Sequence, residues 1–276
     1  MQETGHLQVT ESLFARVYVV GLDDYFRGDN TILELQEPGV EVVRFAATDG
    51  NRIQNLEEVY DAKTVQKLLG RQMSRAEIGC AISHQRIIQD AINFEGEFIV
   101  VLEDDTDLDV PVSALKSLPT VKTSTPTLTE LVTNARFSLP KERIKIKGDL
   151  HARCPKVYRS LSVPTSSRCY VLNRAAIQAL QPNQNRIYYL ADFPPDYLNK
   201  VQFWYTKKPL ASDKDVPSTI GNRPVFSSGI AEVWRETKLI MTWGYGSRKP
   251  FSLKTLISFI FFRRLAALIF RFRRTR

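Results

Sequence analysis

Residues 97–105 have the sequence E-F-I-V-V-L-E-D-D, in which an apolar run passes directly into three carboxylates. The β-branched, apolar run predicts a buried strand over residues 97–102. Ligands of open α/β sheets bind beyond the carboxyl ends of the strands, and Glu103, Asp104 and Asp105 lie at that end. Adjacent carboxylates either extend into water as a surface turn or are neutralised by a cation such as Mg²⁺ or Mn²⁺. This segment alone leaves both interpretations open.

The segments before this strand alternate between apolar strands and helices. Strands are expected at residues 16–22 and 40–45, and helices at 31–36, 56–69 and from Ser74 to about Phe94. Ser74 followed by Glu77 is a capping box, which marks the start of the last of these helices. Strands and helices in alternation, with short connections, predict an α/β fold with a mainly parallel sheet covered by helices on both faces.

The second half of the chain is less regular. We expect a strand at residues 168–172, a helix at 174–180 and a strand at 201–205, separated by loops at 117–129, 183–199 and 213–223. The sequence contains no internal repeat and no clean boundary before its last thirty residues. One domain is therefore predicted over residues 15–246, preceded by a flexible N-terminal segment, residues 1–14.

The overall composition is that of a globular protein. The chain has 276 residues, of which 43% are hydrophobic and 25% charged, so it can bury a core and is not a disordered chain. With only 13 Gly it is not collagen-like either. Three cysteines cannot form a disulfide framework, and their sparse, odd number indicates reduced thiols in a cytosolic setting.

The positive charge of the chain is concentrated at its C-terminal end. The net charge is +8, yet residues 247–276 carry nine basic and no acidic residues, which leaves the rest at −1. A neutral body argues against nucleic acid as a partner, because a basic footprint is normally spread over the folded face. The uncharged stretches of this tail are far shorter than the ~20 residues of a spanning helix. Residues 1–14 carry Glu3 and Glu11 and no apolar run, so we do not expect them to be a secretory signal.

At helical spacing, the end of the tail separates into an apolar and a basic face. Phe261, Leu265, Leu268, Ile269 and Phe272 share one face, and Arg263, Arg264, Arg271 and Arg274 share the other. This pattern predicts an amphipathic helix that lies on an anionic membrane surface. The alternative is a helix that packs on the protein's own core with its arginines in water.

The helix that begins at Ser74 contains further candidates for a site. Residues 74–84 have the sequence S-R-A-E-I-G-C-A-I-S-H, and Gly79, Cys80 and Ala81 are small enough to allow close packing. Glu77 and His84 are seven residues apart and therefore lie on one face. Glu77 could act in capping alone, and His84 could be a core or surface imidazole.

The combination of these motifs resembles glycosyltransferase family 25, the lipopolysaccharide and lipooligosaccharide sugar transferases. The resemblance rests on E-I-G-C-A-I-S-H at residues 77–84, followed by a helix and by I-V-V-L-E-D-D at 99–105. The A-T-D-G turn at residues 47–50 also matches the family pattern. Weaker similarities are C-Y-V-L-N-R-A-A at 169–176, P-D-Y at 195–197 and S-T-I at 218–220 with Arg223.

This resemblance implies a nucleotide-sugar transferase of the GT-A-like fold. The acidic strand end would hold a divalent ion, Mn²⁺ or Mg²⁺, against the diphosphate of the donor, with Glu103 and Asp105 as the metal ligands. Such an ion stabilises the departing nucleoside diphosphate as a Lewis acid. The residues implied in donor binding are Asp49, Glu77, Ser83, His84, Asp104 and Arg223.

The family is classed as inverting, which implies a single base that deprotonates the acceptor hydroxyl. Asp196, in an aromatic and Pro-rich loop, is the candidate for this base. Four aromatic residues of that loop could stack on acceptor sugars or could serve loop packing: Tyr188, Tyr189, Phe193 and Tyr197.

The leading interpretation is therefore a hexosyltransferase, which most simply carries galactose from UDP-galactose to a lipopolysaccharide or other surface glycan. The expected location is the cytoplasm, at the inner face of the cell membrane. Two alternatives stay open at this level. One is a metal-dependent nucleotidyltransferase, although no Gly-rich, basic loop for a triphosphate is present. The other is a non-enzymatic membrane-surface binding protein on a decayed transferase scaffold.

Overall fold

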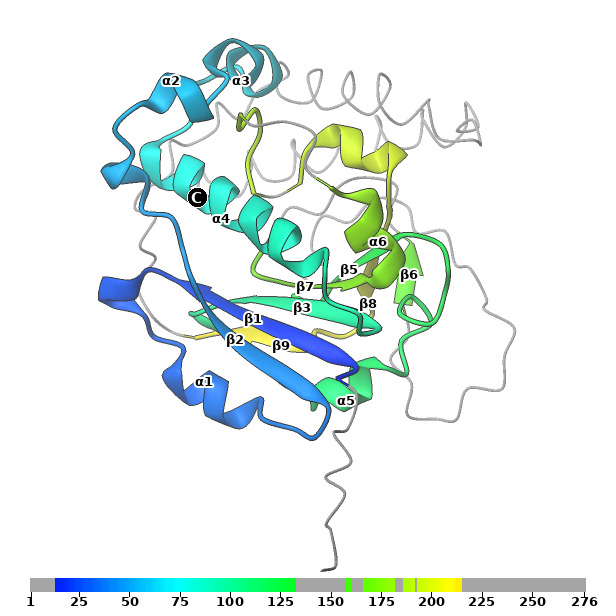
Figure 1. Cartoon of the computed structure of the whole chain (residues 1–276). Coiled ribbons are helices and arrows are strands. Elements are labelled where there is room, and N and C mark those ends of the chain that lie inside the picture. Colours follow the sequence, from blue (N-terminus) through cyan, green and yellow to red (C-terminus); the bar gives the residue numbers. More distant parts are fainter. Residues whose placement is uncertain (1–12, 133–156, 160–165, 182–185, 192, 215–276) are drawn as a thin grey trace, which may run out of the picture.

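The computed structural model describes residues 13–132, 157–159, 166–181, 186–191 and 193–214. They form a central sheet with helices on both faces and a separate pair of short strands (Figure 1). Residues 1–12, Arg223 and the tail at 247–276 lie outside the described residues, so the structure leaves the predicted domain limits untested. None of the helices in the described part of the chain combines the length and hydropathy that crossing a bilayer requires.

The central sheet has seven strands in the order β2-β1-β3-β7-β5-β8-β6. The strands are β1 (Ala15–Gly21), β2 (Val40–Ala46), β3 (Phe98–Glu103), β5 (Thr127–Glu130), β6 (Val157–Arg159), β7 (Cys169–Asn173) and β8 (Gln202–Thr206). β2, β1 and β3 pair in parallel, as β5 and β8 do, whereas β7 and β6 run antiparallel to their neighbours. The predicted α/β fold with a mostly parallel sheet is therefore confirmed.

Helices cover both faces of this sheet (Figure 1). α4 (Arg75–Ala91) and α6 (Arg174–Ala179) lie on one face, and α1 (Asp29–Glu34) and α5 (Val112–Leu115) lie on the other. β3 is buried on both sides, because Ile99 and Val101 pack toward α4 while Val100 and Leu102 pack toward α5. This double burial explains why its sequence is continuously apolar instead of alternating.

The remaining elements connect or extend these layers. They are the 3-10 turns η1 (Asp23–Tyr25), η2 (Gly50–Arg52) and η4 (Pro195–Asn199), the helices α2 (Leu56–Val59) and α3 (Ala62–Leu69), and an antiparallel pair of short strands, β4 (Thr106–Leu108) and β9 (Ala211–Asp213).

Two local predictions are wrong. The single helix expected at residues 56–69 is split into α2 and α3, because Tyr60 makes a β-bridge to Ile187 and the Asp61 carboxylate caps α3 by accepting from the Thr64 amide. The loop expected at residues 117–129 ends as strand β5, which pairs with β7 and β8. Both differences come from long-range pairing that local patterns do not encode.

The start of α4 follows its local sequence. Ser74 accepts from the Glu77 amide while the Glu77 carboxylate accepts from the Ser74 amide, so the predicted capping box is confirmed. Close packing depends on Gly79, where a Cβ atom would lie 2.4 Å from the Thr48 carbonyl oxygen and 2.6 Å from the Gly50 nitrogen. The missing side chain thus allows α4 to contact the turn that follows β2.

Gly79→Ala is expected to destabilise the protein, because its methyl group meets backbone atoms that cannot rotate away. Overpacking of this kind lowers the free energy of unfolding by about 1–3 kcal/mol, even though alanine is the better helix former. Urea denaturation measures the change, with Gln89→Ala on the exposed face of the same helix as the matched control. A Gly79→Ala protein as stable as the wild type would contradict this packing.

Candidate functional site

A pocket opens at the carboxyl ends of β1, β2 and β3, beneath one side of α4. Its cavity volume is about 130 Å³, and it opens to solvent. Six of the residues predicted for the site line it, namely Asp49, Ser83, His84, Glu103, Asp104 and Asp105. The sequence reasoning did not identify Arg27 and Cys80 as site residues, and both also line the pocket.

Asp104 faces inward and is only 6% exposed. Its carboxylate accepts hydrogen bonds of 3.0 Å from both the backbone amide and the guanidinium of Arg27, and this carboxylate raises the pKa of the arginine. The guanidinium also lies 3.4 Å from Asp105, whose side chain stays partly exposed. A buried carboxylate requires such a partner. Arg27 therefore neutralises part of the acidic run without any added cation.

Glu103 points to a different side of the pocket from this pair, toward α4. Its Oε1 lies 3.3 Å from the Ser167 hydroxyl and 3.9 Å from Nε2 of His84. Burial lowers the pKa of His84 to about 4, so the imidazole is neutral near pH 7. The contact between His84 and Glu103 is consequently a polar contact with a neutral ring.

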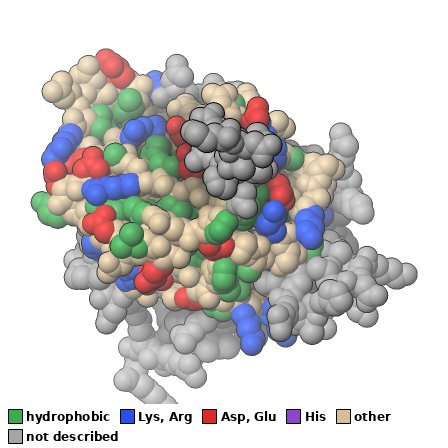
Figure 2. Space-filling view, turned by 60° about the horizontal axis from the view of Figure 1, so that its bottom comes forward, with side chains coloured by type: hydrophobic (Ala, Val, Ile, Leu, Met, Phe, Trp, Pro, Cys, Tyr) green, Lys and Arg blue, Asp and Glu red, His purple; other side chains and the backbone are tan. Residues whose placement is uncertain are grey.

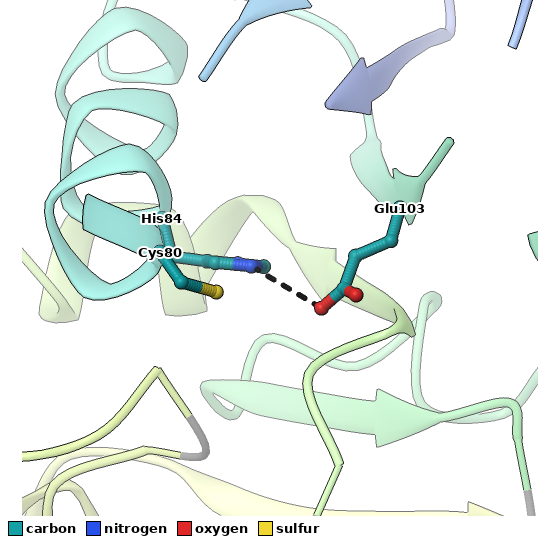
Figure 3. A group of neighbouring side chains, drawn as sticks. All are labelled: Cys80, His84 and Glu103. Atoms are coloured by element: carbon teal, nitrogen blue, oxygen red, sulfur yellow. Dashed lines mark ion pairs between the residues drawn. The ribbon is translucent and has the colours of Figure 1, made fainter. Parts of the chain in front are cut away.

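Cys80 and His84 project from successive turns of α4 toward the carboxylate of Glu103 (Figure 3). One ligand atom of each residue lies within 4.8 Å of the other two. Among the described residues this is the one group of three or more His, Cys, Asp or Glu side chains that could hold a metal ion. Asp104 and Asp105 are not members of it.

Asp49 and Ser83 hold the turn that forms the opposite wall. Asp49 caps η2 by accepting from the Asn51 amide at 2.9 Å and lies 3.4 Å from Nε of Arg52. The Ser83 hydroxyl accepts from the Thr48 amide and donates to the Gly79 carbonyl. The A-T-D-G turn is therefore anchored to α4 by a buried side chain.

Glu77 is not among the residues that line the pocket. It is buried at the start of α4, where both its carboxylate oxygens accept from Arg71 at 2.6 and 2.8 Å. Burial by itself raises the pKa of Glu77, but the hydrogen bonds from Arg71 and Ser74 outweigh it and lower the pKa below 4.5. Its observed contacts serve the capping box and an ion pair.

Asp196 lies in η4 and is not among the residues that line this pocket. It accepts a hydrogen bond from the Tyr188 hydroxyl and lies 3.7 Å from Nζ of Lys200. Tyr188 belongs to a second, aromatic pocket, whose lining also includes Tyr170, Phe193, Tyr197 and His84. His84 is thus common to both pockets, and its Nδ1 lies 2.9 Å from the Tyr170 hydroxyl.

These features define an α/β protein with an acidic ligand pocket at the ends of parallel strands, next to an aromatic pocket. The chain belongs to glycosyltransferase family 25 (LPS biosynthesis protein), whose sequence profile matches residues 14–196. The protein is therefore a glycosyltransferase, and its family points to lipopolysaccharide biosynthesis. No curated protein matches the chain significantly. The matched range includes every predicted site residue except Arg223.

Glu77→Gln is expected to lower the free energy of unfolding by about 2–3 kcal/mol at pH 7, because Arg71 loses its charged partner. The folded-state pKa of Glu77 is depressed, so its stabilisation is fully present above the unfolded value of 4.5 and is lost as pH falls through the folded pKa. Urea denaturation of the wild type and the variant measures this at pH 7 and pH 3. The difference between their free energies of unfolding should be smaller at pH 3. Glu57→Gln, at an exposed position, is the control, and a difference that does not change with pH would refute the ion pair.

Proposed function

We propose that this enzyme transfers a hexose, galactose in the simplest case, from a UDP-sugar to a lipopolysaccharide or another surface glycan. The observation that carries the proposal is the convergence of Asp49, His84 and the acidic end of β3 on one pocket at the carboxyl edge of the sheet. Nucleotide ligands of α/β proteins bind at such edges. Family membership supports the reaction class, and the GT-A-like fold is proposed with it.

On the donor side, the nucleoside is proposed to lie against the turn that contains Asp49, with Ser83 and His84 along the adjoining wall. Asp104 contributes by fixing Arg27 beside the pocket, where the guanidinium can approach the diphosphate. Glu77 supports the same wall indirectly, through the start of α4. Arg223 is proposed to pair with phosphate, although it lies outside the described residues.

The carboxylates at the end of β3 fit the divalent ion that the family implies. Glu103 and Asp105 both line the pocket, and their side chains are 21% and 23% exposed. Asp104 is more deeply buried against Arg27, whose guanidinium also lies 3.4 Å from Asp105. Two carboxylates suit the hard ions Mn²⁺ and Mg²⁺. We propose that these two residues hold the ion, which when bound would offset charge on the leaving nucleoside diphosphate.

Asp196 is proposed as the base of an inverting transfer. The Tyr188 hydroxyl, part of the lining of the aromatic pocket, donates to its carboxylate. Phe193 and Tyr197 are buried and serve packing, so the partly exposed Tyr188 and Tyr189 are proposed to stack on an acceptor sugar. In this role one oxygen of Asp196 takes the proton of the acceptor hydroxyl as that hydroxyl attacks the donor sugar.

The tail at residues 247–276 is proposed to bind the cytoplasmic face of the cell membrane, where a lipid-linked acceptor would be reached. On the face shown in Figure 2, the described basic and acidic side chains are interspersed. The excess positive charge of the chain lies in the tail sequence, where arginines and apolar residues fall on two opposite faces at helical spacing.

Deletion of residues 247–276 is expected to release the protein from vesicles that contain anionic lipid, because nine basic residues are removed. Co-sedimentation of the full chain and the deletion variant measures this, with neutral vesicles as the control for non-specific binding. Undiminished sedimentation of the deletion variant would refute the membrane role of the tail.

The reaction itself is tested by UDP release from a panel of UDP-hexoses, with and without Mn²⁺. Asp105→Asn is expected to lower kcat/KM on the order of 100-fold, because the ion loses a ligand. Asp196→Asn is expected to lower kcat by about 10²–10⁴-fold while UDP binding is retained.

Asp107→Asn is the matched control for the acidic run, because Asp107 pairs with Lys214 and does not line the pocket. It should keep the wild-type rate. Binding of UDP-sugars without turnover by the wild type would favour the inactive scaffold, and cleavage of a nucleoside triphosphate instead would favour a nucleotidyltransferase.

A further inference from the structure

The three residues Cys80, His84 and Glu103 form a second set of metal ligands at the edge of the donor pocket (Figure 3). We propose that this triad binds a thiophilic divalent cation, with Zn²⁺ as the natural occupant, and leaves one coordination position open to the pocket. This goes beyond the proposed transfer reaction, since the hard-ion site there rests on Glu103 and Asp105.

The geometry arises from ordinary secondary structure. Cys80 and His84 are four residues apart in α4, so both side chains leave the same face of the helix, and Glu103 is the last residue of β3. Nε2 of His84 lies 3.9 Å from the Glu103 carboxylate, and all three ligand atoms lie within 4.8 Å of one another. Bonds of 2.0–2.3 Å around tetrahedral Zn²⁺ separate ligand atoms by about 3.3–3.7 Å. The ligand atoms of the triad therefore need to approach one another by at most about 1.1–1.5 Å.

The chemistry of the three metal-ligand atoms determines which metal this site prefers. A thiolate and an imidazole prefer zinc to the hard ions Mg²⁺ and Mn²⁺, which take oxygen ligands. Cys80 binds as the thiolate, so with the carboxylate of Glu103 it supplies two negative charges to a dication. The resulting site is electrically neutral, which suits a position where His84 is 5% exposed.

The surroundings of the triad resemble the outer shell of a metal centre. Nδ1 of His84 lies 2.9 Å from the Tyr170 hydroxyl, which can hold the ring so that Nε2 faces Glu103. The Ser167 hydroxyl donates to the Glu103 carboxylate at 3.3 Å. Since Cys80, His84 and Glu103 all line the donor pocket, the fourth position of a tetrahedral ion is open to a water or a ligand oxygen there.

The two proposed ion sites share Glu103. Occupation of the triad by Zn²⁺ withdraws this carboxylate from a hard ion at Asp105, so the two metals exclude each other. The zinc site itself does not rest on the proposed function, because its ligands and geometry are independent of which reaction the pocket supports.

Titration of the metal-free full chain with Co²⁺, a spectroscopic substitute for Zn²⁺, tests the site directly. One equivalent should produce the near-ultraviolet thiolate-to-cobalt charge-transfer band and the intense visible bands of a tetrahedral ion, and Zn²⁺ should abolish both. Cys80→Ser should remove the charge-transfer band, and Glu103→Gln should weaken Co²⁺ binding at least tenfold. Asp105→Asn, the control at the hard-ion site, should leave the spectrum unchanged.

Absence of the charge-transfer band in the wild type would overturn the proposal. So would a band that persists in Cys80→Ser, since another cysteine would then be the ligand, or one that is lost in Asp105→Asn. X-ray absorption of the zinc-loaded wild type provides a test without any variant: one sulfur and one imidazole ligand are expected, and a spectrum with no sulfur ligand rejects the site. Transfer is measured separately, on protein loaded with Mn²⁺ alone. Transfer by that sample with no band in the Co²⁺-loaded sample would overturn this site alone, and a band in the Co²⁺-loaded sample with no transfer by the Mn²⁺-loaded one would overturn the proposed function alone.

Discussion

A carboxylate that is nearly buried at the end of β3 must be neutralised, and the pairing of Asp104 with Arg27 meets this requirement. The pair joins the loop after β1 to the end of β3, and Gly21 leaves room for it, because a Cβ there would lie 2.5 Å from the Asp104 carboxylate. Asp104 is taken up by this pair, and the same guanidinium lies 3.4 Å from Asp105, whereas Glu103 turns toward His84. Arg27 thus determines how the three carboxylates of the acidic run are divided between an ion pair and the pocket.

The packing of α4 gives the pocket its other wall. The absence of a side chain at Gly79 brings the helix against the turn after β2, and Ser83 bonds to the backbone of that turn. The same closeness places Cys80 and His84 opposite Glu103. Rigid secondary structure on both sides fixes these side chains more firmly than loops could, which is what a metal or donor site requires.

The sequence predicted those parts of the fold and site that depend on local patterns. Apolar runs and residue spacing predicted β1, β2, β3 and the capping box of α4. The position of the acidic residues at the ligand-binding edge of the sheet was predicted because they follow the carboxyl end of β3. The split at Tyr60 and strand β5 could not be predicted, because each depends on a partner far along the chain. The ion pair of Glu77 with Arg71 could not be predicted either. Arg71 precedes α4, so helical spacing does not relate it to Glu77.

What the sequence by itself determined is the class of fold, the family and the set of acidic and imidazole side chains near the strand ends, because periodicity and short motifs are local properties. Only the tertiary structure decided which of them face one another. Arg27 reaches Asp104 across 77 positions, and Tyr170 reaches His84 across 86. Such contacts are set by how whole elements pack, and burial then fixes the charge state of each group, as for the neutral ring of His84.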